Sequence, residues 1–152
     1  MTPATDMRPD GAPAGASRHR ARQVALQMLY QWEIGRVDMA DVRQSRPAEP
    51  EAPLPDALQA FAERLAEGTA KSIATIDPLI SDAASSWRIE RMNVVDRLIL
   101  RLAVHEFLDE KDTPASVIIN EALELARSFS SDDAVAFVNG VLDAIRRKLE
   151  RA

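Results

Sequence analysis

The most constraining feature of the sequence is a stretch between Asn93 and Leu108 that is apolar on nearly every side of a predicted helix. A helix that is hydrophobic all round must be buried, so other helices have to surround it. Asn93 predicts the N-cap, and Asp96, three residues later, completes a start that is similar to a capping box. The apolar residues of this stretch are Val94, Val95, Leu98, Ile99, Leu100, Leu102, Ala103, Val104 and Phe107.

Polar residues inside this predicted core helix need partners, because buried charges are usually paired. We interpret Arg101 as a member of a structural ion pair with Glu106 or Glu121, and not as a catalytic group. We interpret His105 as a satisfied core or boundary histidine, because a metal site normally needs several converging ligands.

Apolar periodicity and capping residues predict further helices on both sides of this stretch. We predict an all-α fold, a single helical domain of about six or seven helices in two packed three-helix groups, spanning residues 17–152. The predicted helices cover residues 17–35 with Ser17 as the cap, 38–44, 55–76, a short helix that starts at Asp77-Pro78, 93–108, 117–129 and 132–149.

Several single residues carry packing predictions. Gly68 and Gly140 lie inside predicted helices, where glycine costs about 1 kcal/mol relative to alanine. A compensating close approach of a neighbouring helix is therefore expected at each. Trp87, in a connection, is predicted to cover one end of the core, and Phe129 is assigned to the apolar face of its helix.

Composition limits the function classes. Residues 1–16, rich in Pro, Ala, Gly and Asp, are predicted to be disordered, and the prolines of residues 46–55 predict a surface loop. The chain has no cysteine, which excludes a disulfide framework and fits a reducing cytoplasm. It has no run of about 20 apolar residues, the length that a helix needs to span a bilayer. The sequence shows no phosphate loop, HExxH or GxSxG motif, so neither catalysis nor a cofactor is expected.

Cations cluster near the start of the first long predicted helix, at Arg18, His19, Arg20 and Arg22. Basic residues at a helix N-terminus oppose the macrodipole, so stability does not explain them. One interpretation is a solvated basic turn, and the other is an anion-binding site. The net charge of −5 argues against broad coating by nucleic acid but permits a local basic patch.

Two residues of the last predicted helix fall on opposite shoulders of its apolar face. Phe137 and Asn139 are each expected at a boundary between core and water. One interpretation makes Phe137 a peripheral core residue and Asn139 a satisfied polar group between helices. The other makes them contacts for a ligand.

The segment INEALELARSFSSDDAVAFVNGVLD resembles the C-terminal signature of the NusB family, small bacterial RNA-binding factors of transcription antitermination. The arginine-rich start followed by Ala25-Leu26, Leu29-Tyr30 and Trp32 is similar to that family's first helix, and LILRLAVHEFL resembles its central helix. The resemblance implies an all-helical protein that binds boxA-type single-stranded RNA together with the NusE ribosomal protein. In ribosomal RNA transcription, that assembly helps RNA polymerase to ignore terminators.

The resemblance also implies roles for individual residues. His19 departs from the family's more usual arginine, which puts the number of phosphate contacts in doubt. Asp96 matches an acidic site that faces the NusE partner. The arginines are expected to contact phosphates, Phe137 to stack on a base, and Arg20 and Phe137 to lie on one wall of a shared groove. The predicted RNA-binding residues are Arg18, His19, Arg20, Arg22, Asp133, Phe137 and Asn139.

Two alternatives come from other function classes. NusB-like domains also occur attached to RNA cytosine methyltransferases, so this chain could serve such an enzyme in trans. The third possibility is a helical adaptor that binds protein and no RNA.

Overall fold

The computed structural model describes residues 14–44, 54–85 and 87–151, with side chains described from residue 18 onward. All regular structure in these ranges is helical, which confirms the predicted all-α class. The chain divides into two compact units, Met1–Ala66 and Glu67–Ala152, and the division falls inside α3. Most of the predicted N-terminal tail (1–16) and of the proline-rich loop (46–55) lies outside the described residues.

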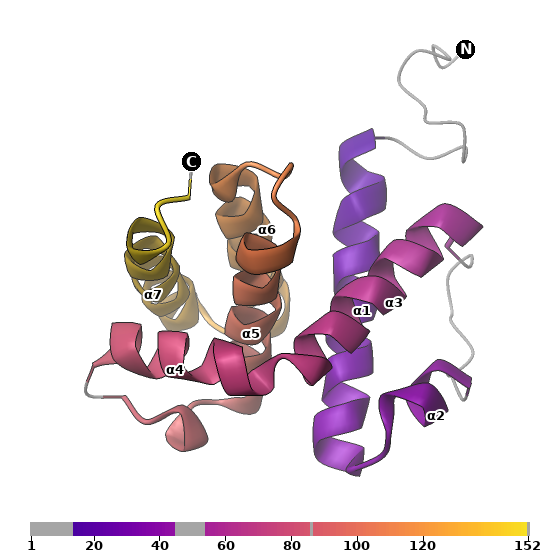
Figure 1. Ribbon diagram of the computed structural model, residues 1–152, viewed down its shortest axis with the longest axis horizontal. Helices are drawn as coiled ribbons and strands as arrows, with labels where there is room; N and C mark the ends of the chain where they lie inside the picture. Colours follow the sequence, from indigo (N-terminus) through magenta and orange to yellow (C-terminus); the bar gives the residue numbers. More distant parts are fainter. Residues whose placement is uncertain (1–13, 45–53, 86, 152) are drawn as a thin grey trace. The chain divides into compact units, whose positions relative to one another are not determined.

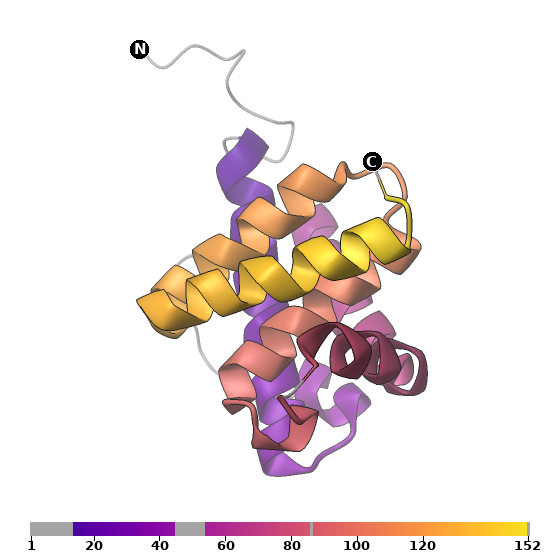
Figure 2. The ribbon, with the colours of Figure 1, turned by 90° about the vertical axis from the view of Figure 1, so that its left-hand side faces the viewer.

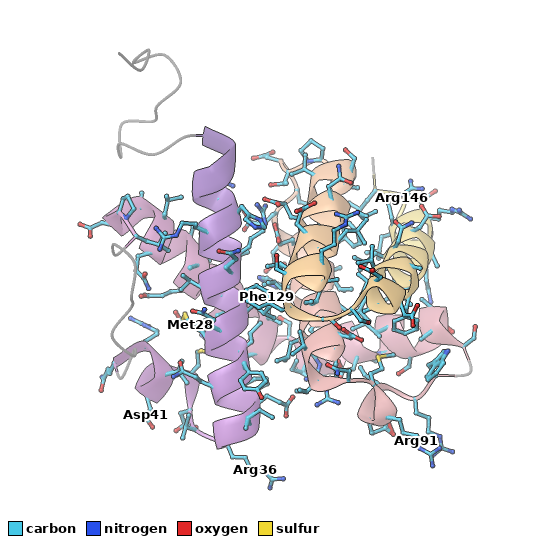
Figure 3. All side chains as sticks on the ribbon, turned by 180° about the vertical axis from the view of Figure 1, so that it is seen from behind. Met28, Arg36, Asp41, Arg91, Phe129 and Arg146 are labelled. Carbon is cyan, nitrogen blue, oxygen red and sulfur yellow. The ribbon has the colours of Figure 1, made fainter. Side chains whose placement is uncertain are left out.

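The first unit contains α1 (Ala14–Gly35), α2 (Met39–Gln44) and most of α3 (Asp56–Lys71). α2 follows the predicted stop at Gly35 and packs against the C-terminal part of α1 (Figure 1). α1 starts three residues earlier than predicted, so Ser17 lies within the helix and is not its N-cap. The buried residues of this unit include Ala21, Val24, Ala25, Met28 (labelled in Figure 3), Leu29, Val42, Leu58, Phe61 and Leu65.

The second unit is built around α5 (Val94–Asp109), the predicted core helix. Its residues from Leu98 to Phe107 are all buried, and it packs against α4 (Ile73–Ala84), α6 (Ala115–Phe129) and α7 (Asp132–Lys148). α6 and α7 lie side by side, as Figure 1 and Figure 2 show. This group therefore has four helices where three were predicted, with a short 3-10 turn, η2 (Ile89–Arg91), before α5.

The predicted Asn93 cap of α5 is confirmed, and Ser131 caps α7. The Asn93 side chain accepts a 2.9 Å hydrogen bond from the backbone nitrogen of Val95. Ser131 accepts a 3.2 Å bond from the nitrogen of Ala134. These caps satisfy amides that the first turn of a helix leaves without partners.

The break between α3 and α4 differs from the prediction. α3 ends at Lys71 and α4 begins at Ile73, so the chain turns at Ser72 and α4 continues through Pro78. The predicted start at Asp77-Pro78 was wrong, although it used a favourable capping pattern. Pro78 removes one hydrogen bond from α4. Asp77 does not cap a helix but forms an ion pair with Arg101 of α5.

Arg101 forms an ion pair with Asp77, the residue that was predicted to start a helix. The Arg101 guanidinium lies 2.8 Å from the Asp77 carboxylate, and the predicted pairing of Arg101 with Glu106 or Glu121 stays a prediction. His105 is buried, as predicted, and its Nδ1 lies 3.7 Å from the Asp109 carboxylate. A pairing between residues 24 positions apart, on two different helices, is set by packing and cannot be seen in local spacing.

The two glycine predictions have opposite outcomes. A Cβ added to Gly68 would lie 2.4 Å from the ring of His105, so the predicted close approach is confirmed there. At Gly140 an added Cβ would meet no atom of another described helix within 4 Å, so that prediction was wrong. Gly140 faces outward from α7 and is exposed.

Two aromatic predictions were also wrong. Trp87 does not cover the core, because 59% of its surface is exposed. Phe129, at the last turn of α6, is 43% exposed, while Ile118, Ala122 and Leu125 provide the buried face.

Among the described helices, none is both long enough and apolar enough to cross a bilayer.

Candidate nucleic-acid interface

The basic cluster of the first unit lies deeper in its helix than the sequence suggested. Because α1 begins at Ala14, the residues from Arg18 to Arg22 occupy its second and third turns. The influence of the macrodipole falls off within the first turn. The unfavourable charge placement inferred from sequence is therefore largely relieved, and the arginines must be explained by their contacts.

Three arginines gather around one aromatic ring in this unit. The guanidinium carbons of Arg18, Arg64 and Arg22 lie 4.3, 5.1 and 5.5 Å from the ring centroid of Phe61. Cation–π contacts of this kind contribute about 0.5–1 kcal/mol each at exposed sites. Arg64 and Phe61 lie one helical turn apart on α3, and neither was among the predicted site residues.

The four predicted cationic residues differ in accessibility. Arg22 is only 2% exposed, so most of its side chain serves packing next to Phe61. Arg18, His19 and Arg20 are partly exposed. A ring nitrogen of His19 lies 3.3 Å from the amide nitrogen of Gln23, one turn later. Arg18 and Arg20 are thus better placed than Arg22 to reach a phosphate.

In the second unit, the N-termini of α5 and α7 meet. The hydroxyl of Ser130, at the end of α6, donates a 2.6 Å hydrogen bond to Oδ1 of Asp96 on α5. Asp96 therefore ties the α6–α7 joint to the start of α5 and does not complete the predicted capping box. This bond orients the carboxylate at the edge of a pocket.

The pocket between these two helix starts has a volume of about 390 Å³. Its apolar lining comes from Trp87, Met92, Ala134 and Phe137. Its polar lining comes from Arg91, Asn93, Asp96, Ser131 and Asp133. The volume is at the lower end of the range of ligand sites, about 300–1,000 Å³.

An aromatic pair forms one wall of this pocket. The rings of Trp87 and Phe137 are arranged edge to face, with centroids 6.0 Å apart and planes at 67°. Trp87 is exposed and Phe137 is half-buried. The Arg91 side chain extends outward from η2 (Figure 3). The wall therefore combines stacking surfaces with a nearby cation.

The structure brings together some of the predicted site residues and separates others. Asp96, Asp133 and Phe137 line the same pocket, but Asn139 does not. Two residues along a helix are about 200° apart around its axis, so Asn139 points away from Phe137. Asn139 is exposed on another side of α7. Arg20 belongs to the first unit and Phe137 to the second, so their shared groove stays a prediction.

Trp87 and Arg91 are the residues of the pocket that sequence analysis missed as ligand contacts. The available signal was a tryptophan and two arginines within a short polar connection, WRIERMN. The position of this connection next to α7 depends on how α4 and α7 pack.

Within the described residues, no group of three or more His, Asp or Glu side chains is arranged to hold a metal ion.

Comparisons with a family model and with known proteins both point to the NusB family. The model of the NusB family matches residues 19–147. A transcription antitermination protein NusB from Solibacter usitatus is 46% identical over 134 residues, covering 88% of this chain and 91% of that protein.

Two solved structures are similar in fold. T. maritima NusB superposes with a TM-score of 0.77 at 35% identity, covering 86% of this chain and 91% of that one. A structure described as antitermination factors NusB and NusE in complex with dsRNA gives a TM-score of 0.71 at 26% identity. That match covers 88% of this chain and 98% of the other.

Proposed function

Because this chain belongs to the NusB family, we propose that it is a transcription antitermination factor that binds boxA-like single-stranded RNA together with the NusE ribosomal protein. It acts as a binding factor within the RNA polymerase antitermination complex, supports ribosomal RNA transcription, and catalyses no reaction. Because its RNA is a nascent transcript, its place of action is the cytoplasm.

The observation that supports a single-stranded ligand is the accessible aromatic wall formed by Phe137 and Trp87. Bases inside a duplex are stacked on their neighbours, whereas unpaired bases can stack on aromatic side chains. Each such contact contributes about 1–3 kcal/mol. Phe137 is half-buried at the pocket wall, so one part of its ring is anchored and another faces the ligand.

The basic cluster on α1 complements this wall. Arg18 and Arg20 are assigned to phosphates, with His19 as an additional donor, and Arg22 supports them through its packing next to Phe61. Phosphate contacts position the strand, whereas base contacts read its sequence. Asp133 in the pocket and Asn139 on the other shoulder of α7 are assigned to base edges. A protein with a net charge of −5 can bind RNA in this way because the cations are local.

A binding assay with matched RNAs tests the proposal. The full chain is titrated with a labelled boxA-like RNA, single-stranded or annealed to its complement, with and without NusE. We expect tighter binding to the single strand, and further tightening with NusE. Phe137→Ala should lower the affinity about tenfold while changing the thermal melt little. Equal affinity for both RNAs, or no binding in any arm, would contradict the proposed function.

Asp96 is the proposed contact for NusE, and a charge reversal tests it. Asp96→Lys should weaken capture of NusE in a pull-down. Asp109→Lys, an exposed position at the other end of α5, is the matched control and should leave capture unchanged. If Asp96→Lys still captures NusE normally, the assignment of Asp96 fails.

The two alternatives are less well supported. The curated relative named above is an antitermination protein, and this favours antitermination over service to an RNA methyltransferase. A purely structural adaptor would have no need of a pocket that combines exposed aromatic rings with an arginine. The RNA titration distinguishes the proposed RNA-binding function from the adaptor alternative, because a pure adaptor would bind NusE and no RNA.

A further inference from the structure

We propose that Arg64 of α3 is a further contact for an RNA phosphate, and that the ring of Phe61 holds its guanidinium in position for this role. This inference rests on the proposed function, because it adds a residue from a second helix to the basic cluster of α1. Its basis is the arrangement of Arg18, Arg22 and Arg64 around Phe61, all within the first unit.

The three arginines differ in how far they reach into solvent. Arg22 is 2% exposed and serves packing, whereas Arg18 is partly exposed and Arg64 is exposed. The guanidinium carbons of Arg18 and Arg64 lie 4.3 and 5.1 Å from one ring centroid, so their separation is at most about 10 Å. Charges at this distance still interact at 0.1 M salt, where the Debye length is about 10 Å. The two accessible cations therefore reinforce each other's attraction for an anion.

The contact with Phe61 and a contact with phosphate use different parts of a guanidinium. The group lies over the aromatic ring with its carbon near the ring centroid, and the attraction comes from the negative face of the ring. Its N–H donors lie in the plane of the guanidinium and point outward from its edges. Two parallel donors at an edge match a phosphate. The ring therefore does not compete with a phosphate for these donors.

Phe61 also lowers the cost of ordering the side chain of Arg64. A long side chain loses rotamer freedom when it binds a ligand, and this loss weakens binding. The ring of Phe61 is 4% exposed and fixed in the core, and it restricts the guanidinium above it before RNA arrives. Phe61 is therefore a positioning residue, which acts on RNA through the arginine and does not touch it.

The neighbouring carboxylate, that of Glu63, is directed to another side of α3. It lies 3.4 Å from Nε of Arg43, and it accepts a 2.8 Å hydrogen bond from the amide of Gln59. Adjacent residues of a helix do not face each other, whereas residues three apart do. Arg64 therefore shares a face with Phe61, while Glu63 binds the side chains of Gln59 and Arg43.

The alternative role of Arg64 is structural. Its cation–π contact could serve only to stabilise the packing of α3 around Phe61, with no ligand. Such a role would change the melting temperature and leave RNA binding and its salt dependence unaltered. The experiments therefore measure stability and RNA binding on the same variants.

Substitutions of Arg64 in the full chain test the phosphate contact. Arg64→Ala should lower the affinity for single-stranded boxA-like RNA about tenfold. It should also lower the logarithmic salt slope by about 0.7. Arg64→Lys keeps the charge but loses the forked donors, so the slope should stay while the affinity falls in part.

Arg36→Ala is the matched control for charge. It removes one exposed arginine at the far end of α1, about 25 Å from Arg18 along the helix (Figure 3). This distance exceeds the Debye length, about 10 Å at 0.1 M salt. Arg36→Ala should therefore change neither the affinity nor the slope.

The positioning role of Phe61 requires a variant that loses the ring but keeps an apolar side chain. Phe61→Leu should lower RNA affinity about threefold or more, and Phe61→Tyr should restore most of it. The losses from Phe61→Leu and Arg64→Ala should not add, because the ring acts through the arginine. Leu58→Ala, a buried change on the same helix, should lower the melting temperature but leave RNA affinity unchanged well below its melt. Circular dichroism melts check folding at the assay temperature.

The outcomes separate this inference from the proposed function. If wild-type protein binds RNA and Arg64→Ala matches it in affinity and slope, the inference is overturned and the proposed function stands. Fully additive losses would overturn the positioning role of Phe61. If Phe61→Leu does not fold, the Arg64 variants decide by themselves.

Two further outcomes concern other ligands. If Arg64→Ala loses capture of NusE but binds boxA-like RNA normally without it, Arg64 contacts an acidic protein side chain, and the phosphate assignment is overturned. If wild-type protein binds no RNA at all, the proposed function fails before Arg64 is considered.

Discussion

Arg101 of α5 and Asp77 of α4 form a bidentate ion pair across the core of the second unit. Nε of Arg101 donates to Oδ1 of Asp77 at 2.9 Å, and its terminal nitrogen donates to Oδ2 at 2.8 Å. The Arg101 side chain is 9% exposed and that of Asp77 is 23% exposed. The pair explains how an arginine is accommodated in an otherwise apolar helix, since both charges are compensated with good geometry.

Asp77→Ala should therefore destabilise the protein by about 2–4 kcal/mol, because it removes two hydrogen bonds and an ion pair from a buried guanidinium. Chemical denaturation measures this change. Arg127→Ala is the control, since its ion pair with Glu124 is about half exposed and should contribute less than about 1 kcal/mol. Equal effects of the two variants would show that the Asp77 pair has no special role in the core.

The two helical glycines should respond to alanine in opposite directions. Gly68→Ala places a Cβ against the buried ring of His105 and should destabilise the fold by about 1–3 kcal/mol. Gly140→Ala meets open space and should stabilise it by up to about 1 kcal/mol, through helix propensity. Thermal melts of the two variants provide the comparison. A stabilising Gly68→Ala would show that His105 moves aside easily.

Arg151 should contribute to stability from the end of the chain. Its guanidinium donates to the carbonyl oxygens of Phe107, Glu110 and Thr113 at 2.9, 3.1 and 3.0 Å, and so covers the C-terminal end of α5. Arg151→Ala should cost about 1–2 kcal/mol in unfolding free energy. Arg147→Ala, whose side chain is 72% exposed in its pair with Asp143, should cost little. A neutral Arg151→Ala would contradict this assignment.

Arg20 and Arg22 of α1 should have different roles, Arg20 as an RNA contact and Arg22 as a packing residue. Arg20→Ala should weaken boxA binding and lower its logarithmic salt slope by about 0.7, while the melting temperature changes little. Arg22→Ala should mainly lower the melting temperature, because Arg22 is 2% exposed and packs near Phe61. Titrations at several salt concentrations measure both slopes. An unchanged slope for Arg20→Ala would remove its phosphate role.

Asp82 should titrate at lower pH than an ordinary aspartate. The hydrogen bond from Lys148 and then the charge of that ammonium group lower the pKa of Asp82 below its ordinary value of 3.8. Because the folded pKa is depressed, the pair's stabilisation is present above the ordinary value and is lost as pH falls through the folded one. Carboxyl NMR titration should show this, and Lys148→Ala should return the midpoint towards 3.8.

Most of the helices, and the caps at Asn93 and Ser131, could be predicted because their signals are local. Apolar residues recur every three or four positions, and Asn93 and Ser131 directly precede the segments that they cap. The apolar surface around α5 required a surrounding shell of helices, and this is the observed arrangement. The INEALELARSF and FVNGVLD segments carried the family resemblance, because long stretches of matching sequence are specific.

Tertiary packing decided what local spacing could not express. The same residue type had different outcomes at Gly68 and Gly140, because only one faces a neighbouring helix. Asp77 had the pattern of a helix cap, but the packing of α4 on α5 placed it against Arg101. Trp87 joined Phe137 at a pocket because two helix starts meet there. Periodicity determines which face of a helix is apolar, whereas contacts between distant residues exist only once those faces have packed.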